Sequence, residues 1–177
     1  DRIEAGAYFR KYYKETLISS NPDAVLTTFM LSYIKDTSIW EPSGPIDGFR
    51  MHMTLAPSLD MRNGTYYNST FNLDTRKYFR IGENSAYAVR GMYLASDGKD
   101  PQRYYLGGSW DLRGYPRRSF YDKNILLLNN ELRFPLVDRL YIGFPIGAIN
   151  FQSIRGALFS DTGKAWGDKN SRLVGSF

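Results

Sequence analysis

The sequence predicts an all-β protein, an antiparallel transmembrane β-barrel. Long stretches alternate between apolar and polar side chains, as in strands whose two faces meet different surroundings. Aromatic residues make up 16% of the 177 residues, with 14 Tyr and 11 Phe, a content that favours strands over helices. The sequence has no run of about 18 apolar residues, so we expect no helical membrane span.

Two segments show the alternation most clearly, and both predict long strands with one apolar and one polar face. Residues 66–81 alternate over far more than the roughly five or six residues of an ordinary strand. Their polar face would carry Tyr66, Asn68, Thr70, Asn72, Asp74, Arg76, Tyr78 and Arg80. With residues 48–60 included, a barrel would place Phe71, Leu73, Phe79, Met51, Met53 and Leu55 against lipid, and Asp74, Arg76, Arg50 and His52 in the lumen. In a soluble sandwich the same apolar face would be the core, and the alternation alone does not choose between the two.

Further segments bring the expected total to seven or eight strands. In residues 124–136, Leu126, Leu128, Leu132 and Phe134 share one face, and Asn129, Glu131 and Arg133 share the other. The remaining strand-like segments are residues 2–14, 25–36, 86–96, one long stretch over 141–166, and the beginning of another strand over 172–177.

The connections between these strands alternate in character. "DTSIWEPSGPIDG", "GENS" and "VDR" are rich in turn residues, whereas "KETLISSNPD", "DMRNG" and residues 97–123 are more polar. Short turns at one end and longer loops at the other are typical of the periplasmic and extracellular ends of a barrel. We therefore expect residues 97–123 to form a long extracellular loop, whose tip could fold into the lumen.

This loop contains "LGGSWDLRGYPRRSF", residues 106–120. Gly107, Gly108 and Gly114 permit unusual backbone dihedrals and close approach. Arg113 lies beside the last of these glycines, where its guanidinium could meet carboxylates bidentately. Candidate partners are Glu131 and Asp161 on the following strands. Spacing alone also allows a solvated Arg113 and two ordinary lumen carboxylates.

Composition narrows the possible functions. The chain has no Cys and one His, which excludes cysteine-ligated metals and sites with two histidines, so we expect no metal and no cofactor. No Gly-x-x-x-x-Gly-Lys phosphate loop occurs. The net charge of +5 comes from basic residues spread along the chain, so no nucleic-acid partner is expected. An enzyme would have to use His52 with Ser58 or Asp60, but His52 and Ser58 lie about 20 Å apart along one strand.

The ordered set "LRGY", "NNELRFPL" and "LFSDTGKAW" resembles the outer-membrane assembly and secretion barrel superfamily, which includes BamA-type insertases, two-partner secretion transporters and their surface-antigen relatives. "YIKDTSIWEPSGPIDGFR" resembles a strand–turn–strand of the same family. The resemblance implies that Arg113, Gly114 and Tyr115 form a loop latch. It implies that Glu131 and Asp161 are its lumen partners, and that Phe159 and Gly163 complete a Phe-x-Asp-x-Gly motif.

Barrels of this family have sixteen strands, so the resemblance implies that residues 1–177 are one domain, a fragment from the second half of the barrel. It also implies a non-enzymatic protein of the bacterial outer membrane that contacts lipid and inserts or translocates polypeptides. Periplasmic domains or accessory subunits are implied as further partners. The alternative is a complete eight-stranded barrel, a permitted size, acting as a porin or as a lipase or protease scaffold.

Overall fold

The computed structural model describes the chain except for residues 13–23, 43, 138–139, 152–153, 168–171 and 177. Within the described residues, no helix is long and apolar enough to cross a membrane. The strands are β1 (Arg2–Tyr12), β2 (Ala24–Asp36), β3 (Ile39–Glu41), β4 (Gly44–Asp60), β5 (Thr65–Arg80), β6 (Ala86–Gly98), β7 (Tyr104–Leu106), β8 (Phe120–Asp122), β9 (Asn124–Val137), β10 (Leu140–Phe144), β11 (Gly147–Phe151), β12 (Ile154–Trp166) and β13 (Arg172–Ser176).

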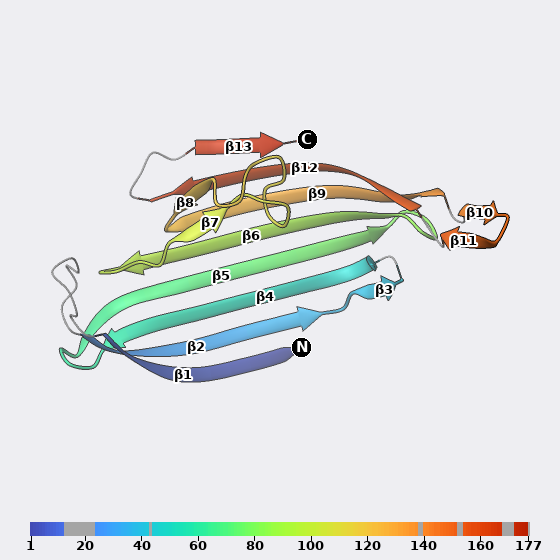
Figure 1. Ribbon diagram of the computed structural model, residues 1–177. Coiled ribbons are helices and arrows are strands. Elements are labelled where there is room, and N and C mark those ends of the chain that lie inside the picture. Colours follow the sequence, from blue (N-terminus) through green and yellow to red (C-terminus); the bar gives the residue numbers. More distant parts are fainter. Residues whose placement is uncertain (13–23, 43, 138–139, 152–153, 168–171, 177) are drawn as a thin grey trace.

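One antiparallel sheet dominates the structure (Figure 1). Its strands follow the order β1-β2-β4-β5-β6-β9-β12-β13, and the short β3 pairs with the beginning of β4. Eight strands along this path agree with the predicted seven or eight, and the all-β antiparallel fold class is confirmed. The sheet is a partial barrel: among the described residues, β1 and β13 form its two edges and do not pair with each other.

The two faces of the sheet follow the predicted alternation over most of its length. Cross-strand partners place Arg50 opposite Arg76, and Arg76 opposite Arg90, on the face that the long loop covers. We call this the inner face. Leu55 lies opposite Phe71 on the outer face, where Leu55 is 47% exposed. The apolar and polar sets of β4 and β5 therefore lie on opposite faces, as expected.

Tyr66 is an exception, and its predicted face is wrong. Ser58 pairs with Asn68 but Leu59 pairs with Tyr66, so β5 carries one extra residue at this point, Tyr67. Such a bulge shifts the alternation by one position. The hydroxyl of Tyr66 consequently donates a hydrogen bond to Oγ of Ser69 at 2.9 Å on the outer face.

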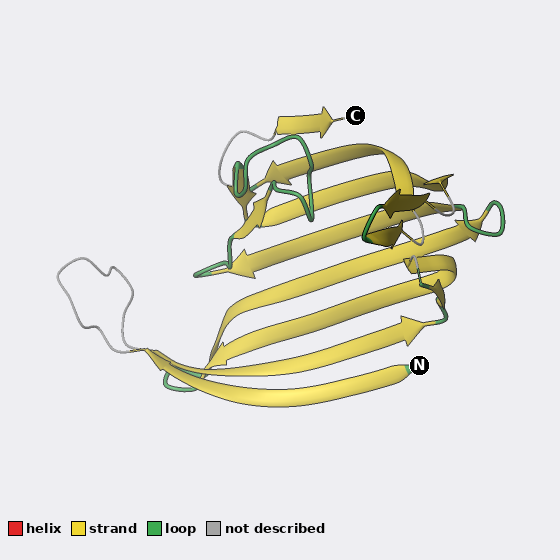
Figure 2. Ribbon diagram, turned by 45° about the vertical axis from the view of Figure 1, so that its right-hand side comes forward, coloured by secondary structure: helices red, strands yellow, loops and turns green. Residues whose placement is uncertain are grey.

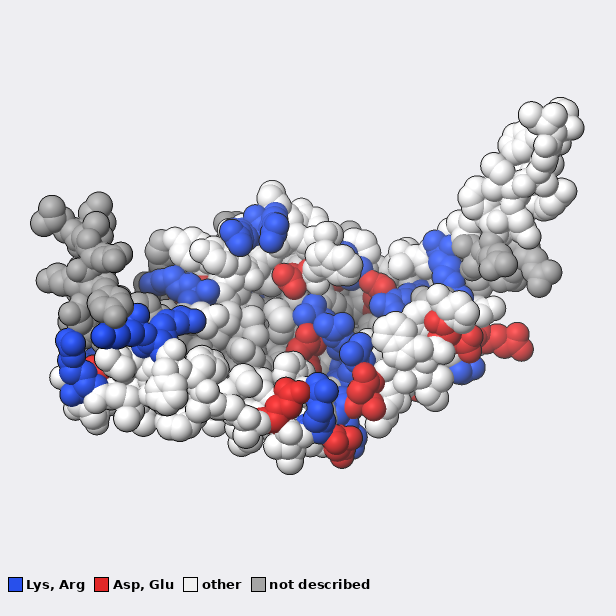
Figure 3. Space-filling view, turned by 60° about the horizontal axis from the view of Figure 1, so that its bottom comes forward, with Lys and Arg blue, Asp and Glu red and all other residues white. Residues whose placement is uncertain are grey.

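The stretch over 141–166 is also not one strand. Its first part forms the hairpin of β10 and β11, which pair only with each other, and β12 begins at Ile154. The hairpin extends from the end of the sheet as a separate arm (Figures 1 and 2). Figure 3 shows that the arm carries no charged residue. Ile146 at its turn is fully exposed. Pro145 and Gly147 mark this turn in the sequence, but the residues around it are nearly all apolar and do not alternate.

The connections lie at two ends of the sheet, as antiparallel order requires (Figure 1). The short turn at 81–85 and the β2–β3–β4 connection lie at the hairpin end, whereas the turn at 61–64 and the long loop lie at the other. "KETLISSNPD", which is residues 14–23, and the predicted last residues of the first strand, 13–14, lie outside the described residues. So do two residues of "VDR", 138–139.

Candidate functional site

The long connection between β6 and β9 folds back over the inner face, across β6, β9 and β12 (Figures 1 and 2). It carries the short hairpin of β7 and β8, so it is more ordered than the sequence suggested. Leu106 and Leu112 of the loop are completely buried against Ile125 and Leu127 of β9 and Met92 of β6. The inner wall is therefore apolar where Leu106 and Leu112 pack against it.

Arg113 lies beyond this apolar cluster and contacts Asp161 of β12. Its Nε and Nη2 donate to the two carboxylate oxygens, each at 2.8 Å. The backbone N–H of Arg113 donates to Oδ2 of Asp161 at 3.0 Å. Asp161 is completely buried and the Arg113 side chain is 23% exposed. The carboxylate is thus held by a planar guanidinium in a bidentate arrangement, the strong geometry for this pair of groups.

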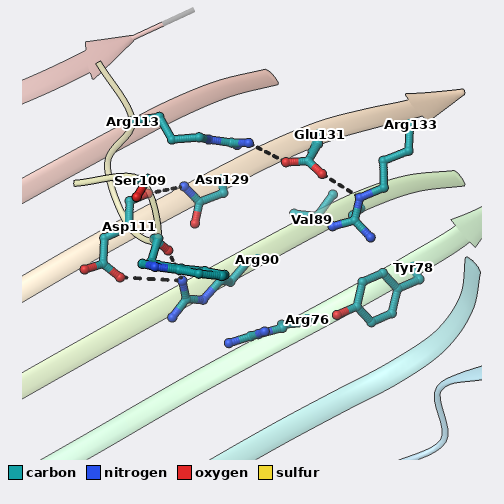
Figure 4. Close-up of a pocket in the computed structure, with 12 residues that line it drawn as sticks. Arg76, Tyr78, Val89, Arg90, Ser109, Asp111, Arg113, Asn129, Glu131 and Arg133 are labelled. Carbon is teal, nitrogen blue, oxygen red and sulfur yellow. Dashed lines mark hydrogen bonds and ion pairs between the residues drawn. The ribbon is translucent and has the colours of Figure 1, made fainter. Parts of the chain in front are cut away.

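Glu131 of β9 contacts the same guanidinium through Nη1 of Arg113. Its other carboxylate oxygen accepts a hydrogen bond from Nε of Arg133 at 2.5 Å (Figure 4). Hydrogen bonding to Asp161, together with that to Glu131, raises the pKa of Arg113 above its ordinary value. The arginine is therefore a permanent cation that contacts two neighbouring strands.

Phe159 and Gly163 lie on the same face of β12 as Asp161, two residues before it and two after it. The ring of Phe159 lies beneath the Arg113 guanidinium, whose Cζ is 3.8 Å from the ring centroid, a cation–π contact. At Gly163, a Cβ would approach Cδ2 of Leu106 to 2.6 Å. Phe159 and Asp161 thus contact the Arg113 side chain, and Gly163 leaves room for Leu106 of the loop.

Gly114 and Tyr115 direct the loop toward β13. Gly114 has φ of +82°, in the region that favours glycine, and its Cβ would lie 3.1 Å from Cβ of Ser176. The hydroxyl of Tyr115 donates to the carbonyl oxygen of Gly175 at 3.0 Å. Its ring packs edge-on against Phe120 with centroids 5.3 Å apart. The structure therefore brings all of the site residues named from the sequence to one place.

Several contacts of this loop could not be predicted from the sequence, and two of them are made to backbone oxygens near Arg113. Asn129 donates through Nδ2 to the carbonyl oxygen of Asp111 at 2.7 Å, and Arg90 of β6 donates to that of Trp110 at 3.0 Å. Asn129 was expected on the polar face of its strand, and Arg90 was expected within a strand. In both contacts the acceptor is a backbone oxygen of the loop. A backbone acceptor leaves no signal in the sequence.

A cavity of about 320 Å³ lies between the loop and the wall beside these contacts (Figure 4). Its lining combines cationic, anionic and aromatic groups. They include Arg76, Arg90, Arg133, Glu131, Asp111, Tyr78 and Trp110.

The residues considered for an enzyme have other partners. Nε2 of His52 contacts Oγ1 of Thr54 at 3.2 Å, and Oγ of Ser58 contacts that of Thr28 at 2.7 Å. Asp60 accepts hydrogen bonds from the turn at Arg62 and Asn63. These hydrogen bonds hold the side chains of β4 and of the turn that follows it.

The structure is an open antiparallel sheet of the kind that forms β-barrels, and its long loop returns to the inner wall through Arg113. The chain belongs to the Omp85 superfamily: the model of the Omp85 superfamily domain matches residues 10–175. Proteins of this family insert or transport polypeptides at the bacterial outer membrane. No curated protein and no solved structure gave a significant match to the chain.

Proposed function

We propose that this chain is part of an outer-membrane barrel that inserts or translocates polypeptides, and that its loop latch holds the lumen in the working conformation. The latch comprises Arg113, Gly114 and Tyr115 of the loop, with Asp161 and Glu131 of the wall. One observation carries the proposal. In a barrel of this family, the loop guanidinium contacts a completely buried aspartate bidentately.

Burial decides how strongly such a pair can hold the loop. An exposed ion pair contributes about 0–1 kcal/mol. Removing one partner of a buried pair leaves an unpaired charge and can cost about 3–5 kcal/mol. Asp161 is completely buried, whereas the Arg113 side chain is 23% exposed. We therefore expect the free-energy cost of removing one partner to lie between these two ranges.

The latch acts in this proposal as a structural element and not as a catalyst. The chain offers no phosphate loop for ATP. The driving force for insertion or transport would come from the folding of the substrate and from strand exchange at the lateral seam of the barrel. Loosening the latch would therefore alter the lumen and impair substrate handling.

The open sheet supports a larger barrel. Both edges, β1 and β13, present backbone groups that must be paired in a bilayer. We propose that further strands, up to the sixteen of the family, complete the barrel in the outer membrane, with the long loop on the extracellular side. Periplasmic domains or accessory subunits would deliver unfolded polypeptides to it.

Reconstitution of the full-length protein in lipid vesicles tests this function. A urea-denatured outer-membrane β-barrel is added from outside, and its folding is followed by its mobility on unheated gels. A parallel assay follows uptake of an unfolded secreted polypeptide into the vesicles. We expect one of the two to be faster than in empty vesicles. No acceleration of either, with ion conductance present, would favour a passive porin instead.

A further inference from the structure

Arg90 occupies an unusual position in the inner wall. It lies directly opposite Arg76 on β5, which in turn lies opposite Arg50 on β4. Like charges directly across neighbouring strands destabilise a sheet. Asp74, two residues before Arg76 on β5, offsets this repulsion, because its carboxylate accepts hydrogen bonds from both Arg76 and Arg90. Arg50 is paired separately, with Asp36.

The hydrogen bonds of Arg90 divide between the wall and the loop. Its Nε and Nη2 face Asp74, with Nη2 at 2.8 Å from Oδ2. Its Nη1 donates to the carbonyl oxygen of Trp110 at 3.0 Å and lies 3.7 Å from Oδ1 of Asp111 (Figure 4). The side chain is 19% exposed. Asp74 thus orients one edge of the guanidinium so that the other edge points at the loop.

This contact is separate from the latch at Arg113. Arg90 lies on β6 and is oriented by β5, whereas Asp161 and Glu131 lie on β12 and β9. Within the described residues, Arg76 makes no hydrogen bond or ion pair to the loop, although it shares Asp74. Through these two arginines the loop is attached to three neighbouring strands, β6, β9 and β12, and Arg90 is itself held by Asp74 of β5.

We propose that Arg90 is a second positioning residue for the long loop, fastening Trp110 and Asp111 to the β5–β6 part of the wall independently of the Arg113 latch. The proposal rests on the proposed function, in which the loop position controls substrate handling. Arg90 acts through the loop and does not itself contact a substrate.

Hydrogen exchange in the full-length protein in detergent tests this assignment, with fragments covering residues 106–112 and 113–120. The amides of Gly108 and Asp111, which bond within the loop, report on the first fragment. We expect Arg90→Met to accelerate exchange there by about tenfold, as the loss of charge-assisted hydrogen bonds predicts. Arg50→Met is the matched control, since it removes an arginine of the same row that pairs with Asp36.

The two attachments are told apart by the fragment that responds. Arg90→Met should act mainly on 106–112, and Arg113→Met mainly on 113–120. If Arg90→Met behaves like Arg50→Met in both fragments, the second attachment is wrong, whatever Arg113→Met does. If only Arg113→Met is silent, the latch fails and the Arg90 assignment stands.

A milder variant covers the case in which Arg90→Met does not fold. Asp111→Asn removes the ion pair to Arg90 without changing the wall, and unheated gels report whether the barrel is intact. We expect a smaller but measurable acceleration in residues 106–112. An intact Asp111→Asn barrel with unchanged exchange in that fragment would show that the ion pair to Asp111 does not fasten the loop. Unchanged exchange in an intact Arg90→Lys barrel, which lacks the guanidinium edge that donates to the carbonyl oxygen of Trp110, would overturn the proposal.

Discussion

Gly163 shows how a single missing side chain makes room for the loop. It lies on the buried face of β12, where a Cβ would stand 2.6 Å from Cδ2 of Leu106 and 3.5 Å from the methyl groups of Leu112. Both leucines are completely buried, so an added methyl group would have to displace a packed leucine side chain. The glycine therefore sets the distance between the loop and the wall.

We expect Gly163→Ala to weaken the attachment of the loop by about 1–3 kcal/mol, the usual effect of overpacking a filled core. The measurement is the temperature at which the intact protein loses its compact mobility on gels. Gly147→Ala is the control, because nothing lies within 4 Å of a Cβ at that position. Equal transition temperatures for both variants would show that the loop does not depend on this contact.

At the scale of the strand, residue alternation determines what each side chain meets. In β4 and β5 the two faces differ sharply, with arginines in register on the inner face and Met53 opposite Leu73 on the outer face. In a bilayer the outer set contacts lipid and the inner set does not. This difference can be measured without knowledge of the substrate.

Single cysteines, introduced into the naturally cysteine-free sequence, test this orientation in the intact protein. A lipophilic thiol reagent should label cysteines at Leu55, Phe71 and Phe79, and a water-soluble reagent should label a cysteine at His52. Tyr66→Cys should follow the lipid-facing group because of the bulge at Tyr67. The same labelling at His52 and Leu55 would be incompatible with a membrane barrel.

The same alternation explains what the sequence could predict. Phe159, Asp161 and Gly163 lie at every second position, so a strand must place them on one face. The bulge at Tyr67 could not be predicted, because it does not interrupt the pattern of residue types. The hairpin of β10 and β11 has turn residues, Pro145 and Gly147, at its turn, but its nearly all-apolar strands do not show which faces they present. The contact of Arg90 with Trp110 was also beyond reach, since it depends on the path of the loop and on a backbone oxygen.

For the whole molecule, the important feature is that the sheet is open. The described parts of β1 and β13 are edge strands, and an unpaired edge is unstable in a bilayer and prone to association. We expect residues 1–177 alone to fail to refold in detergent into a monomer that resists heat. A compact, heat-resistant monomer of this chain would favour the closed eight-stranded barrel.

The central claim is that the Arg113–Asp161 contact holds the loop in the conformation needed for substrate handling. A double-mutant cycle in the full-length protein, read by the vesicle insertion or export assay, tests it most directly. We expect Arg113→Ala and Asp161→Ala to cause similar losses and the double variant to be little worse than either one. Losses that simply add, or single variants that work as well as the unmodified protein, would contradict the account.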